Sequence, residues 1–510
     1  MTAALRAPSW REALALASLR SLPRQALHDY LGSRRWFGAK GRVTRALEIE
    51  GAIPVAWAGA PDEPYVIALV RLELDDGTEL RYQLPLGVVP ASDPLAGDAL
   101  ATVEATGGAA GALVDGALIP AFRRGLATAF RTGAEFTDGS RRWTVEAIGD
   151  GGAELPDESR VAGAEQSNTS LIFGDVAICK FFRRLEPGEN PDVEIARFLT
   201  TRTSFRNTPQ LMGVLVLEED GARTVAGMLS RYLPGSRDAW AHALERVDTY
   251  LRSGEDAKND FAAEARRLGG VTRALHEALS SDEDDPAFAP AFATNEDLDR
   301  WSDAALAMLD RAMTRLASRA DALEGPTQAH ARAMVQRRAA LESRVRELVD
   351  EVRSAGDPGM RIRHHGDYHL GQVLRTVEGR WMIIDFEGEP SRPLEERRAR
   401  HSPLRDVAGM LRSFAYAAAT GAMRIGGLGR DPQVETRSAR WEREAREQFL
   451  GGYLAEHGAA ADALLPSTAT GTTALLALFE AEKLFYELGY ELDNRPAWAW
   501  IPLRGIAKLL

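Results

Sequence analysis

Two aspartates and an amide in the C-terminal half of the chain have the spacing that phosphoryl transfer requires. Asp367 and Gln372 lie in His365-Gly366-Asp367-Tyr368-His369-Leu370-Gly371-Gln372, and Asp385 follows the apolar pair Ile383-Ile384. In phosphoryl transfer a carboxylate accepts a proton from the attacking hydroxyl or orients it, while carboxylate and amide oxygens bind magnesium. We therefore expect Asp367 to be the catalytic base, and Asp385 and Gln372 to be the Mg²⁺ ligands.

The order of these residues is typical of the catalytic loop of ATP-dependent kinases. An H-x-D pattern is followed by an amide five residues after the aspartate, and a later apolar strand ends in a second aspartate. Any single aspartate could instead stabilise a turn or a helix end, but the full set in this order favours a kinase. Gln372 stands where kinases usually have Asn, and its extra methylene makes it the weaker of the two metal ligands. We expect His365 to brace the loop rather than act as the base.

A lysine for the nucleotide phosphates is expected upstream of this loop. Lys180 lies inside the apolar strand Ala177-Ile178-Cys179-Lys180-Phe181, which is similar to the Val-Ala-Ile-Lys element of kinases. Burial of an ammonium without a partner is costly, so this lysine should meet a carboxylate or a phosphate. Glu194, on the following helix, is the expected carboxylate, and a solvated helix glutamate is the alternative interpretation.

No G-x-G-x-x-G loop precedes Lys180. Glu165-Gln166-Ser167-Asn168-Thr169-Ser170 occupies the place of the phosphate-covering turn, and its hydroxyl and backbone donors can approach phosphates. We expect Ser167, Asn168, Thr169 and Ser170 to contact ATP. The absence of the glycines argues against a eukaryotic-type protein kinase but not against a small-molecule kinase of the same fold.

The distribution of apolar residues predicts an α+β chain with three parts. Residues 1–100 predict a small α+β unit, with a helix near 23–31 and strands at 65–74 and 79–86 joined by an Asp75-Asp76-Gly77-Thr78 turn. Residues 101–235 predict a sheet-rich lobe, and residues 236–510 a helical lobe that contains the catalytic loop. Strands are expected at 171–173, 176–182 and 211–218, and helices at 191–200, 260–279, 295–323, 327–352, 404–419 and 437–457.

Composition limits the classes of function. The chain has 510 residues, enough for two or three cores, and its formal charge of −12 argues against general affinity for nucleic acid or anionic lipid. Cys179 is the only cysteine, so no disulfide can form within the chain. No apolar segment approaches the roughly 20 residues that span a bilayer. We expect a cytoplasmic protein without nucleic-acid or membrane partners.

At these motifs the chain resembles the maltokinases, a bacterial branch of the aminoglycoside-phosphotransferase-like kinases. The resemblance rests on residues 365–375, on Asp385-Phe386-Glu387-Gly388-Glu389-Pro390 with Arg392-Pro393-Leu394, on 402–410, on 482–496, and on Arg35-Trp36-Phe37 with Lys40. It implies a two-lobed protein-kinase-like fold with an N-terminal cap domain and a helix-rich C-lobe. It also implies ATP-dependent phosphorylation of maltose at its anomeric hydroxyl, which gives maltose 1-phosphate for glycogen and α-glucan synthesis.

A sugar site needs planar polar groups for hydroxyls and aromatic faces for the ring. The candidates are Asp238, Trp240, His369, Glu387, Arg392, Lys483, Tyr486, Glu487 and Tyr490. Those on the helix near 486–491 could equally pack and solvate that helix, and Lys483 could be a surface partner of a glutamate.

Other functions remain open at this point. The acceptor could be another sugar or an aminosugar, as in a glucosamine kinase, because a few pocket substitutions change the acceptor without changing Asp367. A polycationic aminoglycoside would require a denser carboxylate cluster near the C-terminus. A catalytically silent nucleotide-binding protein is the alternative from another class. The helical lobe could also bind another α-glucan enzyme.

Overall fold

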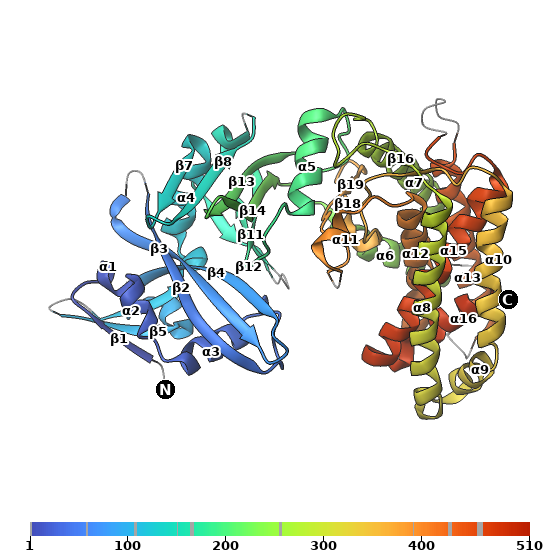
Figure 1. The fold of residues 1–510 in the computed structure, drawn as a ribbon, viewed down its shortest axis with the longest axis horizontal. Coiled ribbons are helices and arrows are strands. Elements are labelled where there is room, and N and C mark those ends of the chain that lie inside the picture. Colours follow the sequence, from blue (N-terminus) through green and yellow to red (C-terminus); the bar gives the residue numbers. More distant parts are fainter. Residues whose placement is uncertain are drawn as a thin grey trace. The chain divides into compact units, whose positions relative to one another are not determined.

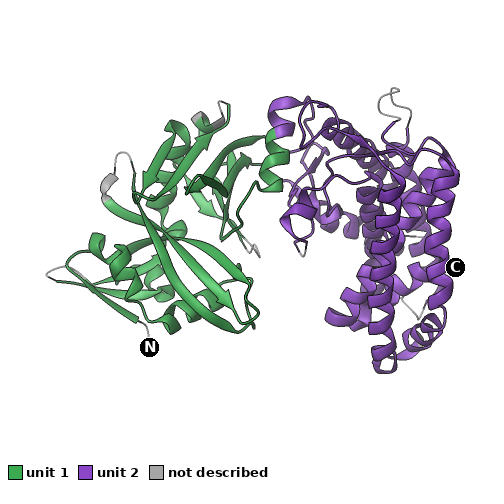
Figure 2. Ribbon diagram, viewed as in Figure 1, with its two compact units in different colours: residues 1–197, 209–234 green, residues 198–208, 235–510 purple. Residues whose placement is uncertain are grey.

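The computed structural model describes residues 3–57, 60–106, 110–149, 151–163, 168–253, 258–390, 392–426, 431–455 and 463–510. The chain forms two compact units, which Figure 2 distinguishes by colour. The N-terminal unit comprises residues 1–197 and 209–234, and the C-terminal unit comprises 198–208 and 235–510. Sheets dominate the first unit and helices the second, as the α+β prediction requires.

The first sheet of the N-terminal unit is formed mainly by the beginning of the chain. Its strand order is β1 (Ala3–Ala7), β5 (Ala101–Ala105), β6 (Gly111–Asp115), β4 (Glu79–Pro90), β3 (Ala60–Leu74) and β2 (Thr44–Trp57), with β12 (Arg184–Leu185) paired to β4. The predicted hairpin between β3 and β4 is confirmed, and Gly77 adopts the positive φ of 82° that its turn requires. The sheet thus continues past residue 100, and the domain boundaries given above stay predictions.

Short helices cover one face of this sheet. They are α1 (Trp10–Ala13), α2 (Leu16–Arg20) and α3 (Arg24–Ser33), and α3 matches the helix expected near 23–31. Leu27 and Leu31 of α3 are buried in one core with Trp36, Phe37 and Tyr82. The helices and the Trp36-Phe37 motif that follows them therefore pack in one core with this sheet.

The second sheet of the N-terminal unit holds the predicted lysine strand. Its order is β7 (Ala134–Thr137), β8 (Arg141–Ala147), β13 (Leu211–Glu219), β14 (Ala222–Arg231), β11 (Ala177–Phe182), β10 (Asn168–Phe173) and β9 (Ser159–Val161). The strands expected at 171–173, 176–182 and 211–218 are therefore confirmed. Phe122, Leu126 and Phe130 of α4 (Pro120–Thr132) share a core with residues of both sheets, and α5 (Pro191–Arg202) follows β11 and β12 along the chain.

Helices form most of the C-terminal unit. They are α6 (Ala239–Arg252), α7 (Phe261–Leu279), α8 (Asn295–Arg319), α9 (Gly325–Val335), α10 (Arg338–Ser354), α11 (Leu394–Arg398), α12 (Leu404–Arg424), α13 (Pro432–Tyr453), α15 (Ala469–Asn494) and α16 (Trp500–Ala507). Figure 1 shows α8, α10 and α15 side by side. The single helix expected at 327–352 is wrong, because the chain breaks between α9 and α10 at Gln336–Arg337, where neither Gly nor Pro marks the break.

Small strands support the catalytic segment. A sheet of β15 (Arg237–Asp238), β18 (Val373–Arg375) and β19 (Trp381–Ile383) lies next to the short 3-10 turn at Leu370–Gln372, and β16 (Ala291–Phe292) pairs with β17 (Met360–Arg361). The strand pair β18–β19 places the end of the catalytic loop beside the start of the Asp385 loop. Among the described residues we find no helix with the length and apolarity to cross a membrane.

Candidate active site

The catalytic loop is attached to the first turn of α12 by Asp406. The Asp406 carboxylate accepts hydrogen bonds from the backbone N–H groups of His365 at 2.7 Å and Gly366 at 2.9 Å. It also lies 3.1 Å from Nε2 of His276. Burial alone would raise the pKa of Asp406, but His364 and the bond from His276 hold it well below its usual range. A buried carboxylate with several donors is a rigid anchor for the residues just before Asp367.

His365 braces the loop, as the sequence predicted. Its Nε2 lies 2.9 Å from the carbonyl oxygen of Ile384, so Nε2 carries the hydrogen, and Nδ1 can accept the N–H of Asp367 at 3.4 Å. The side chain is buried. This histidine thus connects the Asp367 segment to the strand end that carries Asp385.

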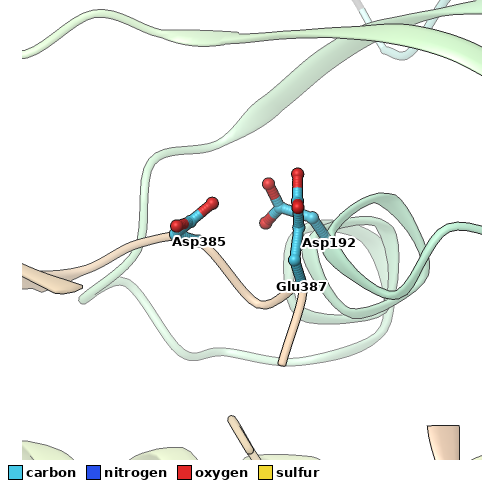
Figure 3. A group of neighbouring side chains, drawn as sticks. All are labelled: Asp192, Asp385 and Glu387. Atoms are coloured by element: carbon cyan, nitrogen blue, oxygen red, sulfur yellow. The ribbon is translucent and has the colours of Figure 1, made fainter. Parts of the chain in front are cut away.

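The two predicted metal ligands belong to adjoining segments of the C-terminal unit. The N–H of Ile384 donates to the carbonyl oxygen of Gln372 at 3.0 Å, next to the pairing of Val373 with Ile383. Asp385 follows with a φ of 67°, a left-handed conformation that costs about 1 kcal/mol for a residue with a Cβ. Figure 3 shows Asp385 and Glu387 on this loop. Their oxygens and the Gln372 amide are donors of the kind that Mg²⁺ prefers, so the residues fit this ion.

Asp367 lines a pocket within the C-terminal unit. The pocket is bordered by Met308, Gly366, Asp367, Tyr368, Glu389, Arg392, Arg405, Asp406, Gly409, Phe479, Glu482, Lys483 and Tyr486. Lys483 Nζ donates to Glu389 Oε1 at 2.8 Å and lies 3.7 Å from Asp367 Oδ1. Burial alone would raise the pKa of Glu389, but Lys483 and Arg392 lower it to about 2. A fixed ammonium therefore lies beside the expected base.

Four charged residues of this pocket were not predicted from the sequence as site residues: Glu389, Arg405, Asp406 and Glu482. Arg405 Nη2 donates to Glu482 Oε1 at 2.9 Å, and Arg392 Nη2 lies 3.5 Å from the same oxygen. All four occur inside segments that carry the maltokinase resemblance, and this was the signal that could have identified them. Among the described lining residues, four are acidic, Asp367, Glu389, Asp406 and Glu482, and three are cationic, Arg392, Arg405 and Lys483.

The predicted sugar residues divide into those that lie near Asp367 and those with other partners. Arg392, Lys483 and Tyr486 line the pocket. His369 Nε2 lies 3.8 Å from Asp367 Oδ2, and its Nδ1 accepts the N–H of Gly371. Burial is the main cause that lowers the pKa of His369, although Asp367 acts in the opposite direction.

The other predicted sugar residues are not among those that line this pocket. Glu487 is buried and pairs with Arg412 at 2.9 Å, which already neutralises its carboxylate. Asp238 accepts the N–H of Ala241 as the N-cap of α6, and Trp240 lies in the first turn of the same helix. Tyr490 is 45% exposed. Sugar-binding roles for these residues and for Glu387 stay predictions.

In the N-terminal unit, the predicted nucleotide lysine has a carboxylate partner. Lys180 Nζ lies 3.0 Å from Oδ2 of Asp192, a buried residue at the start of α5 that Figure 3 also shows. Glu194, the carboxylate expected for this role, lies two residues later in the same first turn. The sequence did not identify Asp192 as the partner of Lys180, and the role of Glu194 stays a prediction.

The predicted phosphate-covering segment is only partly visible. Ser167 lies outside the described residues, whereas Asn168, Thr169 and Ser170 begin β10. Ser170 is the register partner of Lys180 on β11. The strand that carries these hydroxyls thus runs beside the lysine strand, and contacts with ATP stay a prediction.

Comparisons with known proteins agree with this architecture. Residues 30–118 match the model of the maltokinase N-terminal cap domain. A glucosamine kinase from Streptacidiphilus jiangxiensis is 28% identical over 352 residues, which are 68% of this chain and 72% of the relative. A glucosamine kinase from Mycolicibacterium smegmatis (strain ATCC 700084 / mc(2)155) is 30% identical over 356 residues, 68% of this chain and 78% of the relative.

Solved structures show the same fold along the whole chain. A glucosamine kinase in complex with glucosamine, ADP and inorganic phosphate has a TM-score of 0.66 at 23% identity and covers 99% of both chains. The fold and the cap match define a two-lobed kinase-like protein with an N-terminal cap domain and a helical C-terminal region, which confirms the predicted fold. The chain belongs to the family of these sugar kinases, because the Mycolicibacterium relative is 30% identical over 78% of its length.

Proposed function

We propose that this protein transfers the γ-phosphoryl group of ATP to a hydroxyl of a sugar, with glucosamine as the first acceptor to test. The observation that carries the proposal is the position of Asp367. It lies on a loop anchored by Asp406 and borders a pocket lined by charged groups that can hydrogen-bond sugar hydroxyls. The glucosamine kinases among the relatives support this choice of acceptor.

The proposed step uses groups of this chain to position the acceptor and to move one proton. The acceptor oxygen attacks the γ-phosphorus, the bond to the β–γ bridging oxygen breaks, ADP leaves, and Asp367 accepts the hydroxyl proton. Lys483 Nζ, 3.7 Å from Asp367 Oδ1, would hold this side chain in place. His369 lies beside Asp367, and Tyr486 lines the pocket that Asp367 borders. Both residues would orient the sugar.

The remaining predicted residues would hold the nucleotide. Asp385 and Gln372 would bind Mg²⁺, which when bound neutralises charge on the phosphates. Lys180, held by Asp192, would contact the α- and β-phosphates, and Asn168, Thr169 and Ser170 would cover them. Positioning and neutralisation of charge are the main contributions that a protein makes to this chemistry.

Maltose is the second candidate acceptor. The cap match at residues 30–118 and the segment Asp385–Pro390 favour it, because both resemble maltokinases. The acceptor assay separates the two sugars, because protonated glucosamine would interact with Glu389 or Glu482 of the pocket lining, whereas maltose carries no charge. Maltose 1-phosphate, if it is the product, would enter α-glucan synthesis in the cytoplasm.

The test is ADP release with Mg²⁺ and ATP against glucosamine, N-acetylglucosamine, glucose and maltose. We expect glucosamine to give the highest kcat/KM, and phosphorus NMR of the product identifies the hydroxyl that reacts. Asp367→Asn is the inactive control and should lower kcat by about 100-fold or more while nucleotide binding persists. Asp310→Asn, on an exposed face of α8, is the matched control and should keep full activity. ATP binding without turnover of any sugar would instead support a silent nucleotide-binding protein.

A further inference from the structure

Arg183 is the residue at which the chain passes from the second sheet of the N-terminal unit into the first. It lies between β11, which carries Lys180, and β12, whose residues Arg184 and Leu185 pair with β4. The N–H of Gln83 on β4 donates to the carbonyl oxygen of Arg183 at 2.9 Å. Figure 1 labels β4, β11 and β12 in this region. The backbone here belongs to both sheets.

The Arg183 side chain also contacts both sheets. It is 1% exposed, and its Nη2 donates to Asp115 Oδ2 at 2.6 Å. Its Nε donates to Thr169 Oγ1 on β10 at 2.8 Å. The guanidinium lies 5.0 Å from the ring centroid of Trp36 and 5.4 Å from that of Phe181. Asp115 and Trp36 belong to the part of the chain that matches the cap model, whereas Thr169 and Phe181 lie on the proposed nucleotide strands.

The hydrogen bonds of the buried Arg183 guanidinium fix the orientation of this side chain. A guanidinium removed from water requires a charged partner and directed hydrogen bonds, and a planar fork offers donors in fixed directions. Asp115 is itself held, because its Oδ1 accepts the N–H of Ala117 at 3.0 Å. The direction of the Nε donor to Thr169 is therefore set by the first sheet.

Thr169 occupies a sensitive place for nucleotide binding. It pairs with Phe181, and its neighbour Ser170 pairs with Lys180. A shift of β10 at Thr169 would move the backbone donors and hydroxyls that face the lysine strand. The Trp36 motif has no part in the proposed reaction. Its function is thus to pack against the guanidinium of Arg183.

We propose that Arg183 is a positioning residue through which the cap domain holds β10 in the register that binds ATP. The inference rests on the proposed function, because it takes Thr169 and Ser170 to be nucleotide contacts. Arg183 acts through Thr169 and has no part in the proton transfer. The ion pair with Asp115 sets the affinity for ATP and leaves the acceptor pocket unchanged.

The test compares Arg183→Gln, Arg183→Lys and Asp115→Asn with the wild type in full-length protein. Asp115→Asn keeps one oxygen to accept the N–H of Ala117 but replaces the oxygen that bonds Arg183 with an amide NH2, and so removes the ion pair. This variant therefore tests the proposal even if Arg183→Gln does not fold. We expect the KM and Kd for ATP to rise at least about fivefold, with kcat within about twofold and the sugar KM unchanged. Arg183→Lys should recover part of the loss, because it keeps the charge.

Arg81→Gln is the matched control. Arg81 on β4 also joins the two sheets, since its Nη2 lies 2.6 Å from Glu219 of β13, but it does not contact Thr169. It should leave the ATP KM unchanged. A folded Asp115→Asn variant with wild-type affinity for ATP would overturn the proposal. An equal rise in the KM for ATP in Arg81→Gln would also overturn it. Absence of ATP binding in the wild type would refute the proposed function itself.

Discussion

Asp406→Asn tests whether the buried carboxylate positions the catalytic loop. In the wild type one carboxylate oxygen accepts the N–H of Gly366, and the other accepts the N–H of His365 and faces His276. An asparagine has one acceptor oxygen, so at least one buried N–H loses its partner and the other bonds lose their charge assistance. A charged hydrogen bond contributes about 1.5–3 kcal/mol, and we expect unfolding of the C-terminal unit to become easier by about 3 kcal/mol.

Activity should fall as well, because the anchored residues immediately precede Asp367. A displacement of about 1 Å at a reacting group costs about 100-fold in rate, and we expect a loss of this size in kcat. The assays are urea unfolding and steady-state kinetics with the best acceptor. Asp310→Asn removes an exposed ion pair with Arg338 and should cost less than about 1 kcal/mol. An Asp406→Asn protein within about 1 kcal/mol of the wild type and with full kcat would refute the positioning role.

Three further predictions concern the metal, the acceptor and pH. Asp385→Asn should raise the Mg²⁺ concentration for half-maximal activity at least about tenfold or abolish turnover, and unchanged metal dependence would remove Asp385 from the metal site. Lys483→Met should lower kcat/KM for the sugar about tenfold or more without changing the KM for ATP, whereas Lys508→Met on the surface should change neither value. Burial lowers the pKa of His364 from 6.5 to about 4, although Asp406 acts against this. Folding therefore favours the neutral form of His364. Its contribution to the free energy of unfolding is complete above pH 6.5, and about 3 kcal/mol of this free energy is lost as the pH falls towards 4. Urea titrations across this range should show the slope in the wild type and a smaller one in His364→Asn; equal slopes would contradict the assignment.

Much of the fold could be predicted because its signals are local. The turn at 75–78, the strands on either side of Gly174, and the amphipathic helices near 260–279 and 404–419 each carry their periodicity or turn residues within a short window. The break between α9 and α10 could not be predicted, because Gln336 and Arg337 are ordinary helix residues and carry no local signal for a break.

The sequence alone also determined which residue types the site needs. The order of His365, Asp367, Gln372 and Asp385 indicates a kinase because phosphoryl transfer requires a base and oxygen ligands at set intervals along one loop and one strand end. The maltokinase resemblance of the cap is likewise carried by contiguous residues, from Arg35 onwards.

Only the tertiary structure decided which partners these residues meet. Lys180 pairs with Asp192, which the spacing of residues did not single out, and Glu487 pairs with Arg412 in a buried site. Asp406, far from Asp367 in sequence, anchors the catalytic loop. Such pairings depend on how side chains from distant segments are desolvated together, and the free energy of that burial has no counterpart in the spacing of residues along the chain.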